Sequence, residues 1–82
     1  MKKTILVVDD ELTTCVLLEH FLSSQYEIFT TNSVVEALTW LETNLPDLIL
    51  SDIQMPNMDG FELLQEIRLK GYTKHTPIIM LS

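Results

Sequence analysis

The sequence has few of the features that mark secreted or membrane-anchored chains. Its single cysteine, Cys15, allows neither an internal disulfide nor a Cys-x-x-Cys site, and this fits a reducing cytosol. We interpret Cys15 as a small core residue rather than a reactive thiol. The apolar run 5–8 stops at Asp9 and Asp10, and no run approaches the roughly 18 apolar residues of a membrane span. We therefore expect a soluble, cytoplasmic chain without a membrane anchor or a secretory leader.

Basic residues are scarce as well. The 82 residues include 5 lysines and arginines against 12 aspartates and glutamates, which gives a formal net charge of -7. Because an acidic surface repels phosphate groups, we expect this chain alone to bind neither nucleic acid nor an anionic membrane. The charge instead suits a bound cation or a basic partner. With 46% hydrophobic residues, the chain is long enough for one domain with one core.

Short apolar runs alternate with longer amphipathic stretches along the sequence. Four of the runs are typical of buried strands: 4–8, 26–31, 48–50 and 77–81. Three stretches show apolar residues at helical spacing: 11–24, 33–44 and 61–70. Strands that alternate with helices predict an α/β fold with a parallel sheet and right-handed crossovers.

Local signals refine the three expected helices. Asp9 or Asp10 can cap the first helix, and Ser33 with Glu36 forms an S-x-x-E capping box for the second. Trp40 lies one position off the apolar face of the second helix, which indicates a half-buried edge residue or, alternatively, a partner contact. The residues expected on apolar faces are Leu12, Cys15, Val16, Leu18, Phe21 and Leu22 in the first helix and Phe61, Leu64 and Ile67 in the third.

Carboxylates follow two of the expected strands. Asp9 and Asp10 end the first strand, and Asp52 ends the third. If these strands are neighbours, the carboxylates converge at the edge where open α/β sheets bind ligands. Two such charges about 4–5 Å apart repel by roughly 3–4 kcal/mol at an effective dielectric of about 20, and a hard cation such as Mg2+ removes the conflict. The alternative is that these aspartates only cap a helix and a turn.

A carboxylate beside Mg2+ can attack a phosphoryl group and hold it as an aspartyl phosphate. The metal offsets charge on the phosphoryl oxygens, and a nearby hydroxyl can complete the cradle. Ser82 follows the last expected strand and lies at the same sheet edge, where its hydroxyl can donate to a phosphoryl oxygen.

The sequence resembles the receiver domains of two-component response regulators over residues 1–82. The string D-x-x-M-P-x-M-D-G, which starts at Asp52 and ends at Gly60, is highly specific. The segments that carry the resemblance occur in the family's order: 5–11, 46–52, 55–60 and 77–82. The resemblance implies a flavodoxin-like, doubly wound parallel sheet with strand order 2-1-3-4.

Roles for individual residues are also implied by the resemblance. Asp52 would be both the phosphoacceptor and a ligand of Mg2+, and Asp10 would bind Mg2+ directly. Asp9 would act mostly through water, and the backbone carbonyl of Gln54 would be a further protein ligand. Ser82 would hydrogen-bond the phosphoryl group and act in switching.

The same resemblance implies a signalling phosphoacceptor rather than a turnover enzyme, with at most self-phosphorylation and slow autodephosphorylation. The donor would be a sensor histidine kinase or a phosphotransfer protein. Family members continue with a helix, a strand and a helix, so the domain over 1–82 is expected to be incomplete at its C-terminal end. A lysine that pairs with the phosphoryl group would lie in that portion. The uncovered sheet face, or the fourth-strand edge, would then favour a homo-oligomer.

Two rival interpretations remain. A haloacid-dehalogenase-type phosphatase also uses an aspartyl nucleophile with Mg2+, but its D-x-D motif lies on the first strand, where this sequence has adjacent Asp9 and Asp10. The second rival is a shortened receiver that serves as an oligomeric assembly or folding module without efficient phosphotransfer.

Overall fold

Strands and helices alternate along the chain as the apolar pattern predicts. The computed structural model describes residues 2–52, 60–71 and 76–81. The elements are β1 (Lys3–Val8), α1 (Leu12–Leu22), β2 (Tyr26–Thr31), α2 (Val34–Leu41), β3 (Leu48–Asp52), α3 (Gly60–Leu69) and β4 (Ile78–Leu81). No helix in these described ranges is long and apolar enough to cross a membrane.

The four strands form one parallel sheet with the order β2-β1-β3-β4, which confirms the predicted order. Val8 at the end of β1 lies opposite Thr31 of β2 and Ser51 of β3. Asp52 lies opposite Leu81 in the pairing of β3 with β4. The strand ends are therefore level, so that the residues after β1 and at the end of β3 reach the same sheet edge.

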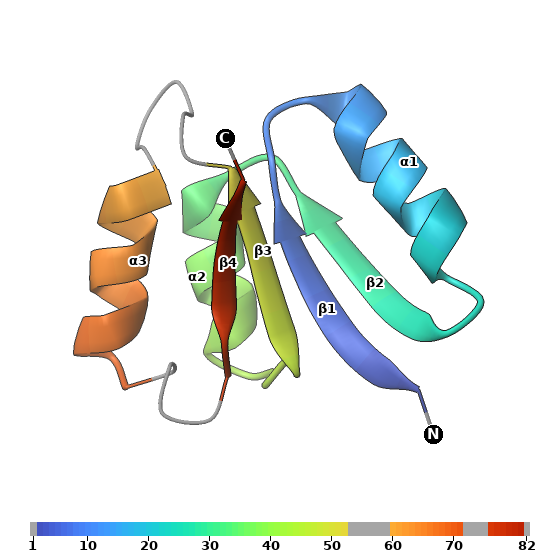
Figure 1. Cartoon of the computed structure of the whole chain (residues 1–82). Helices are drawn as coiled ribbons and strands as arrows, with labels where there is room; N and C mark the ends of the chain where they lie inside the picture. Colours follow the sequence, from blue (N-terminus) through green and yellow to red (C-terminus); the bar gives the residue numbers. More distant parts are fainter. Residues whose placement is uncertain (1, 53–59, 72–75, 82) are drawn as a thin grey trace.

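The helices cover the sheet on two sides, α1 on one face and α2 and α3 on the other (Figure 1). Because successive residues of a strand point to opposite faces, β1 contributes to both cores. Leu6 and Val8 pack with α2 and α3, whereas Ile5 and Val7 pack with α1. The central strand is thus buried on both faces, as its uninterrupted apolar run predicts.

The first turn of α2 departs from the predicted capping box in one bond. The Ser33 hydroxyl accepts from the backbone N–H of Glu36 at 3.3 Å, as predicted. The Ser33 N–H, however, donates to the hydroxyl of Thr31 at 3.2 Å, and that hydroxyl lies 3.2 Å from the Glu36 carboxylate. In a capping box the Ser33 N–H would donate directly to the Glu36 carboxylate. Here the Thr31 hydroxyl lies between these two groups and bonds to both. The helix ends at Leu41, before the predicted Asn44.

The start of α1 differs from the prediction that Asp9 or Asp10 caps it. Its N-cap residue is Glu11, which makes no side-chain capping bond. A carboxylate oxygen of Asp9 instead accepts from the Glu11 N–H at 2.8 Å, one residue before the helix begins. Asp9 therefore orders the approach to the helix without capping it.

The buried face of α1 is narrower than the sequence pattern predicts. Cys15 is buried, and Leu18 and Leu22 pack beside it against the sheet. Val16 and Phe21, which were predicted on this face, are 55% and 70% exposed. At 3.6 residues per turn both lie well to the side of the stripe formed by the other three residues.

The third helix is anchored by Leu63 and Ile67, which are fully buried one turn apart. The prediction for Ile67 is confirmed, and Leu63 was missed. The side chains of Phe61 and Leu64, also predicted to face inward, lie outside the described part of the structure. Gly71 follows the helix with a φ of 79°, and its N–H donates to the carbonyl of Arg68 at 3.0 Å. This left-handed conformation is one that glycine adopts without strain, and it ends the helix.

Candidate metal centre

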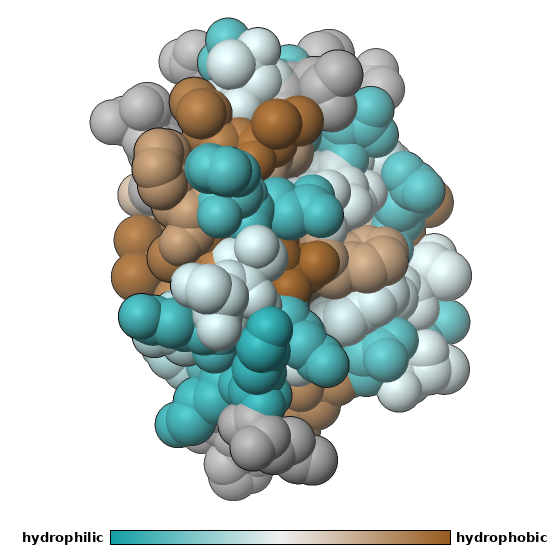
Figure 2. Space-filling model, turned by 90° about the vertical axis from the view of Figure 1, so that its right-hand side faces the viewer, coloured by the Kyte–Doolittle hydropathy of each residue, from teal (hydrophilic) through white to brown (hydrophobic). Residues whose placement is uncertain are grey.

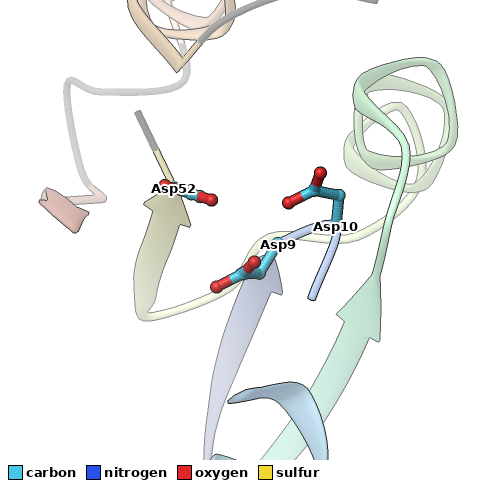
Figure 3. Close-up of side chains that lie close together, drawn as sticks. All are labelled: Asp9, Asp10 and Asp52. Atoms are coloured by element: carbon cyan, nitrogen blue, oxygen red, sulfur yellow. The ribbon is translucent and has the colours of Figure 1, made fainter. Parts of the chain in front are cut away.

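Three carboxylates meet at the C-terminal edge of the sheet. Asp9 and Asp10 directly follow β1, and Asp52 is the last residue of β3. One oxygen from each of the three lies within 4.8 Å of the others. Figure 3 shows the carboxylates of Asp10 and Asp52 facing each other across the gap between the two strand ends. The structure therefore brings together the three aspartates that the sequence singled out.

Backbone contacts fix the position of Asp9 in this group. Its N–H donates to the carbonyl of Thr31 at 3.0 Å, which extends the β1–β2 pairing by one residue. Its carboxylate accepts from the Glu11 N–H, and its carbonyl lies 3.5 Å from the thiol of Cys15, which donates to it. Cys15 is buried, as predicted, and burial raises the pKa of its thiol, which keeps it protonated and unreactive.

The three carboxylates differ in their access to water. Asp9 is buried, Asp52 is half-buried and Asp10 is exposed. Burial raises the pKa of Asp9, and the nearby charges of Asp52, Asp10 and Glu11 raise it further, while the bond from the Glu11 N–H acts in the opposite direction. Its surroundings thus disfavour the charged form of Asp9, a condition that a bound cation relieves.

The donor set and its spacing fit Mg2+. This ion prefers oxygen ligands in octahedral geometry, and metal–oxygen distances of about 2.0–2.1 Å place ligand atoms roughly 3–4 Å apart. The observed spread of up to 4.8 Å is slightly wider, so that a small rotation of Asp10 or Asp52, or a water between Asp9 and the ion, brings the group into range. The exposure of Asp10 leaves room for the water ligands that Mg2+ retains.

Two of the predicted site residues, Gln54 and Ser82, lie outside the described residues. The structure adds a residue that the sequence did not single out, Thr31, which is buried and whose carbonyl holds Asp9. A cavity of about 230 Å³ adjoins this part of the site and is lined by Asp9, Asp10, Cys15, Thr30, Thr31, Asn32 and Glu36. The contact of Thr31 with Asp9 depends on the register of β1 against β2, for which the sequence carries no separate signal.

Comparison with known proteins agrees with this geometry. The family described as the response regulator receiver domain matches residues 5–82. The chain belongs to this family. The match leaves the haloacid-dehalogenase alternative without support.

Relatives of known sequence come from distant organisms. The chain is 41% identical over 83 residues to the alkaline phosphatase synthesis transcriptional regulatory protein PhoP of Bacillus subtilis, and the match covers 100% of this chain and 34% of that protein. It is 44% identical over 81 residues to the two-component response regulator ARR12 of Arabidopsis thaliana, covering 95% of this chain and 13% of that protein. The chain therefore spans about a third of the first relative's length and 13% of the second's.

Solved structures share the fold. The chemotaxis response regulator CheY4 of Vibrio cholerae superposes with a TM-score of 0.90 at 34% identity, covering 98% of this chain and 68% of that one. The response regulator protein TrrA of Thermotoga maritima, solved in complex with Mg(2+)-BeF, gives a TM-score of 0.85 at 42% identity, with coverage of 98% and 68%. The flavodoxin-like fold predicted from the sequence is thereby confirmed.

Proposed function

We propose that this chain is a phosphoacceptor receiver domain of a two-component phosphorelay, and that Asp52 takes the phosphoryl group. The observation that carries the proposal is the position of the Asp52 carboxylate, at a strand end beside two further carboxylates within 4.8 Å. A nucleophilic carboxylate and ligands for Mg2+ are the central groups of such a site. The donor is a phosphohistidine on a sensor histidine kinase or a phosphotransfer protein.

Each site residue has its own role in the transfer of the phosphoryl group. An oxygen of ionised Asp52 attacks phosphorus, the phosphorus–nitrogen bond of the phosphohistidine breaks, and its electron pair returns to the imidazole. Asp9, Asp10, Asp52 and the backbone carbonyl of Gln54 would hold Mg2+, which when bound would offset charge on the phosphoryl oxygens. The hydroxyl of Ser82 donates to one of those oxygens. The Mg(2+)-BeF complex of TrrA, a relative at 42% identity, supports the assignment of the metal.

The product is a signal rather than a released compound, so the domain acts as an acceptor and not as a turnover enzyme. Self-phosphorylation from small phosphodonors and slow hydrolysis of the aspartyl phosphate are the only reactions it would catalyse. We place the chain in the cytoplasm, because a phosphohistidine donor is supplied by cytoplasmic ATP-dependent kinases and the buried thiol suits a reducing compartment.

The direct test is labelling with acetyl phosphate, followed by intact mass and peptide mapping. The expected result is one phosphoryl group on Asp52, formed in Mg2+ and lost in excess chelator. Asp52→Asn should abolish the label, whereas Glu42→Gln, which removes an exposed charge on a different surface, should not change it. Label on another residue, or label that does not depend on Mg2+, would overturn the proposal.

We also propose that the domain self-associates through the sheet face on the α1 side. Apolar side chains reach the surface there, because α1 lies on the side of β1 and β2 (Figure 1). Ile79 of β4 is 48% exposed, and Leu48 and Leu50 of β3 are half-buried on the same face. The strand β4, at the edge of the described sheet, has no charged residue, so that two copies can pair it antiparallel about a two-fold axis.

A further inference from the structure

An aromatic pair lies where α2 packs against β2. The rings of Phe29 in β2 and Trp40 in α2 are stacked, with centroids 5.1 Å apart and planes at 20°. Trp40 is half-buried against the core formed with α2 and α3, as predicted, whereas Phe29 is 40% exposed. The pair therefore joins the helix to the strand and still presents aromatic surface to solvent.

The strand that carries Phe29 lies at the outside of the sheet. In the order β2-β1-β3-β4 only one side of β2 is paired within the described sheet. Figure 2 views the molecule from the side where β2 and α1 lie and shows hydrophobic atoms between hydrophilic ones at the surface. A ligand can therefore approach the aromatic pair from this edge without displacing a helix.

Acidic side chains flank the aromatic pair on two sides. Glu27 lies two residues before Phe29 on β2, so both side chains project from the same face of the strand, and both are exposed. Glu36 lies one helical turn before Trp40, and its carboxylate contacts the hydroxyl of Thr31 at the end of β2. Within the described residues, no lysine or arginine forms an ion pair with Glu27 or Glu36. We call Glu27, Phe29, Glu36 and Trp40 the aromatic–acidic patch.

We infer that the aromatic–acidic patch binds an arginine side chain of a partner protein. A guanidinium group stacks on an aromatic face and keeps its N–H donors free at its rim, where carboxylates accept them. Aromatic surface with a carboxylate on each side offers both contacts at once. A purely apolar ligand would leave the negative charges of both carboxylates uncompensated, and an acidic one would be repelled by them and by the net charge of -7. The partner segment is therefore basic and contains arginine.

Trp40 is the only tryptophan of the sequence, so tryptophan fluorescence reports on this interaction directly. A short peptide of alternating glycine and arginine is titrated into the protein in saturating Mg2+, which occupies the three aspartates. We expect saturable quenching of Trp40, with amide shifts that are largest in β2 and α2. The same peptide with citrulline in place of arginine keeps the shape and loses the charge, and it should bind at least tenfold more weakly.

Two conservative variants test the assignment. Phe29→Leu keeps apolar bulk but removes the ring, and it should weaken binding about two- to fivefold, the range of an exposed cation–π contact. Glu27→Gln removes an exposed charge with little change of shape and should weaken binding by up to about fivefold. Glu66→Gln on α3 is the matched control and should bind like the parent.

Three results would overturn the inference. The first is equal affinity of the parent, Phe29→Leu and Glu27→Gln. The second is peptide binding that disappears in Asp10→Asn or Asp52→Asn, because this would place the arginine at the carboxylate cluster. The third is no saturable binding. Since Glu27→Gln changes an exposed side chain, it remains informative even if Phe29→Leu proves unstable.

Discussion

The carbonyl of Thr31 accepts the N–H of Asp9 at 3.0 Å, and this bond ties the candidate metal centre to the end of β2. The hydroxyl of the same residue accepts from the Ser33 N–H and contacts the Glu36 carboxylate, the groups that start α2. Thr31 is buried, with 6% of its surface exposed. One residue thus joins the metal centre, the β1–β2 pairing and the first turn of α2.

The first prediction follows from this bonding. Thr31→Val keeps the shape of the side chain and its carbonyl but leaves the Ser33 N–H without its acceptor. Because this bond is only part-buried, we expect the free energy of unfolding to fall by about 0.5–1.5 kcal/mol, the net contribution of a typical hydrogen bond. Urea unfolding followed by circular dichroism measures this change. Thr30→Val, on the opposite face of the same strand, is the control, and an equal loss in both variants would contradict the role given to Thr31.

The second prediction concerns the metal. Mg2+ should raise the midpoint of thermal unfolding, because it binds carboxylates that repel each other only when the chain is folded. Asp10→Asn should weaken Mg2+ binding at least tenfold, since even groups that only support a metal ligand contribute about 10–100-fold to affinity. Isothermal titration calorimetry gives the affinities, with Glu42→Gln as the charge-matched control. If Asp10→Asn binds Mg2+ as tightly as the parent, the ion lies elsewhere.

The third prediction is the pH dependence of stability without metal. In the folded chain the pKa of Asp9 lies above the ordinary value of 3.8, mainly because the side chain is buried. The folded state therefore binds this proton more tightly than the unfolded state does. The corresponding stabilisation is fully present below pH 3.8 and is lost as the pH rises through the raised pKa.

Asp9→Asn removes this ionisation and retains an oxygen that can accept from the Glu11 N–H. In chelator at neutral pH the variant should be more stable than the parent, and the difference should shrink as the pH falls toward 3.8. Saturating Mg2+ should reduce or reverse the difference, since the ion favours the carboxylate. Urea unfolding at a series of pH values tests the sign. A variant less stable than the parent at neutral pH in chelator would show that ionised Asp9 is already well stabilised.

The carboxylate cluster could be predicted from the sequence because it depends only on chain order and on the parallel sheet. Asp9, Asp10 and Asp52 each end an apolar run, and parallel strands place those ends at one edge. Thr31 could not be found in this way, because its contact with Asp9 depends on the register that sets Val8 opposite Thr31. A shift of the pairing by one residue would have turned its side chain to the other face.

Side-chain burial in the helices was predicted less well. The sequence pattern of α1 includes Val16 and Phe21, but contact with the sheet reaches only the stripe of Cys15, Leu18 and Leu22. How wide a stripe is buried depends on how closely the helix approaches the sheet and on what lies beside it. Neither quantity can be predicted from the residues of the helix alone. The same holds for Leu63, whose burial depends on how α3 is rotated about its axis.

The fourth prediction concerns self-association. A sheet face that exposes Ile79 and an edge strand without charges should draw copies together at micromolar concentration. Light scattering across a dilution series should show a mass that falls toward the monomer as the protein is diluted. Ile79→Lys places a charge on the exposed face and at the strand edge. Natural edge strands avoid pairing with other chains in this way. The variant should therefore raise the concentration at which the copies associate at least tenfold.

Leu69→Lys is the matched control, because Leu69 is 82% exposed but lies on α3, which covers the opposite sheet face. It should leave the association unchanged. If Leu69→Lys abolishes association and Ile79→Lys does not, the interface lies on α3. A cooperatively folded parent that stays monomeric throughout the dilution series would contradict the prediction, since the apolar area exposed beside β3 and β4 would then be too small to hold two copies together.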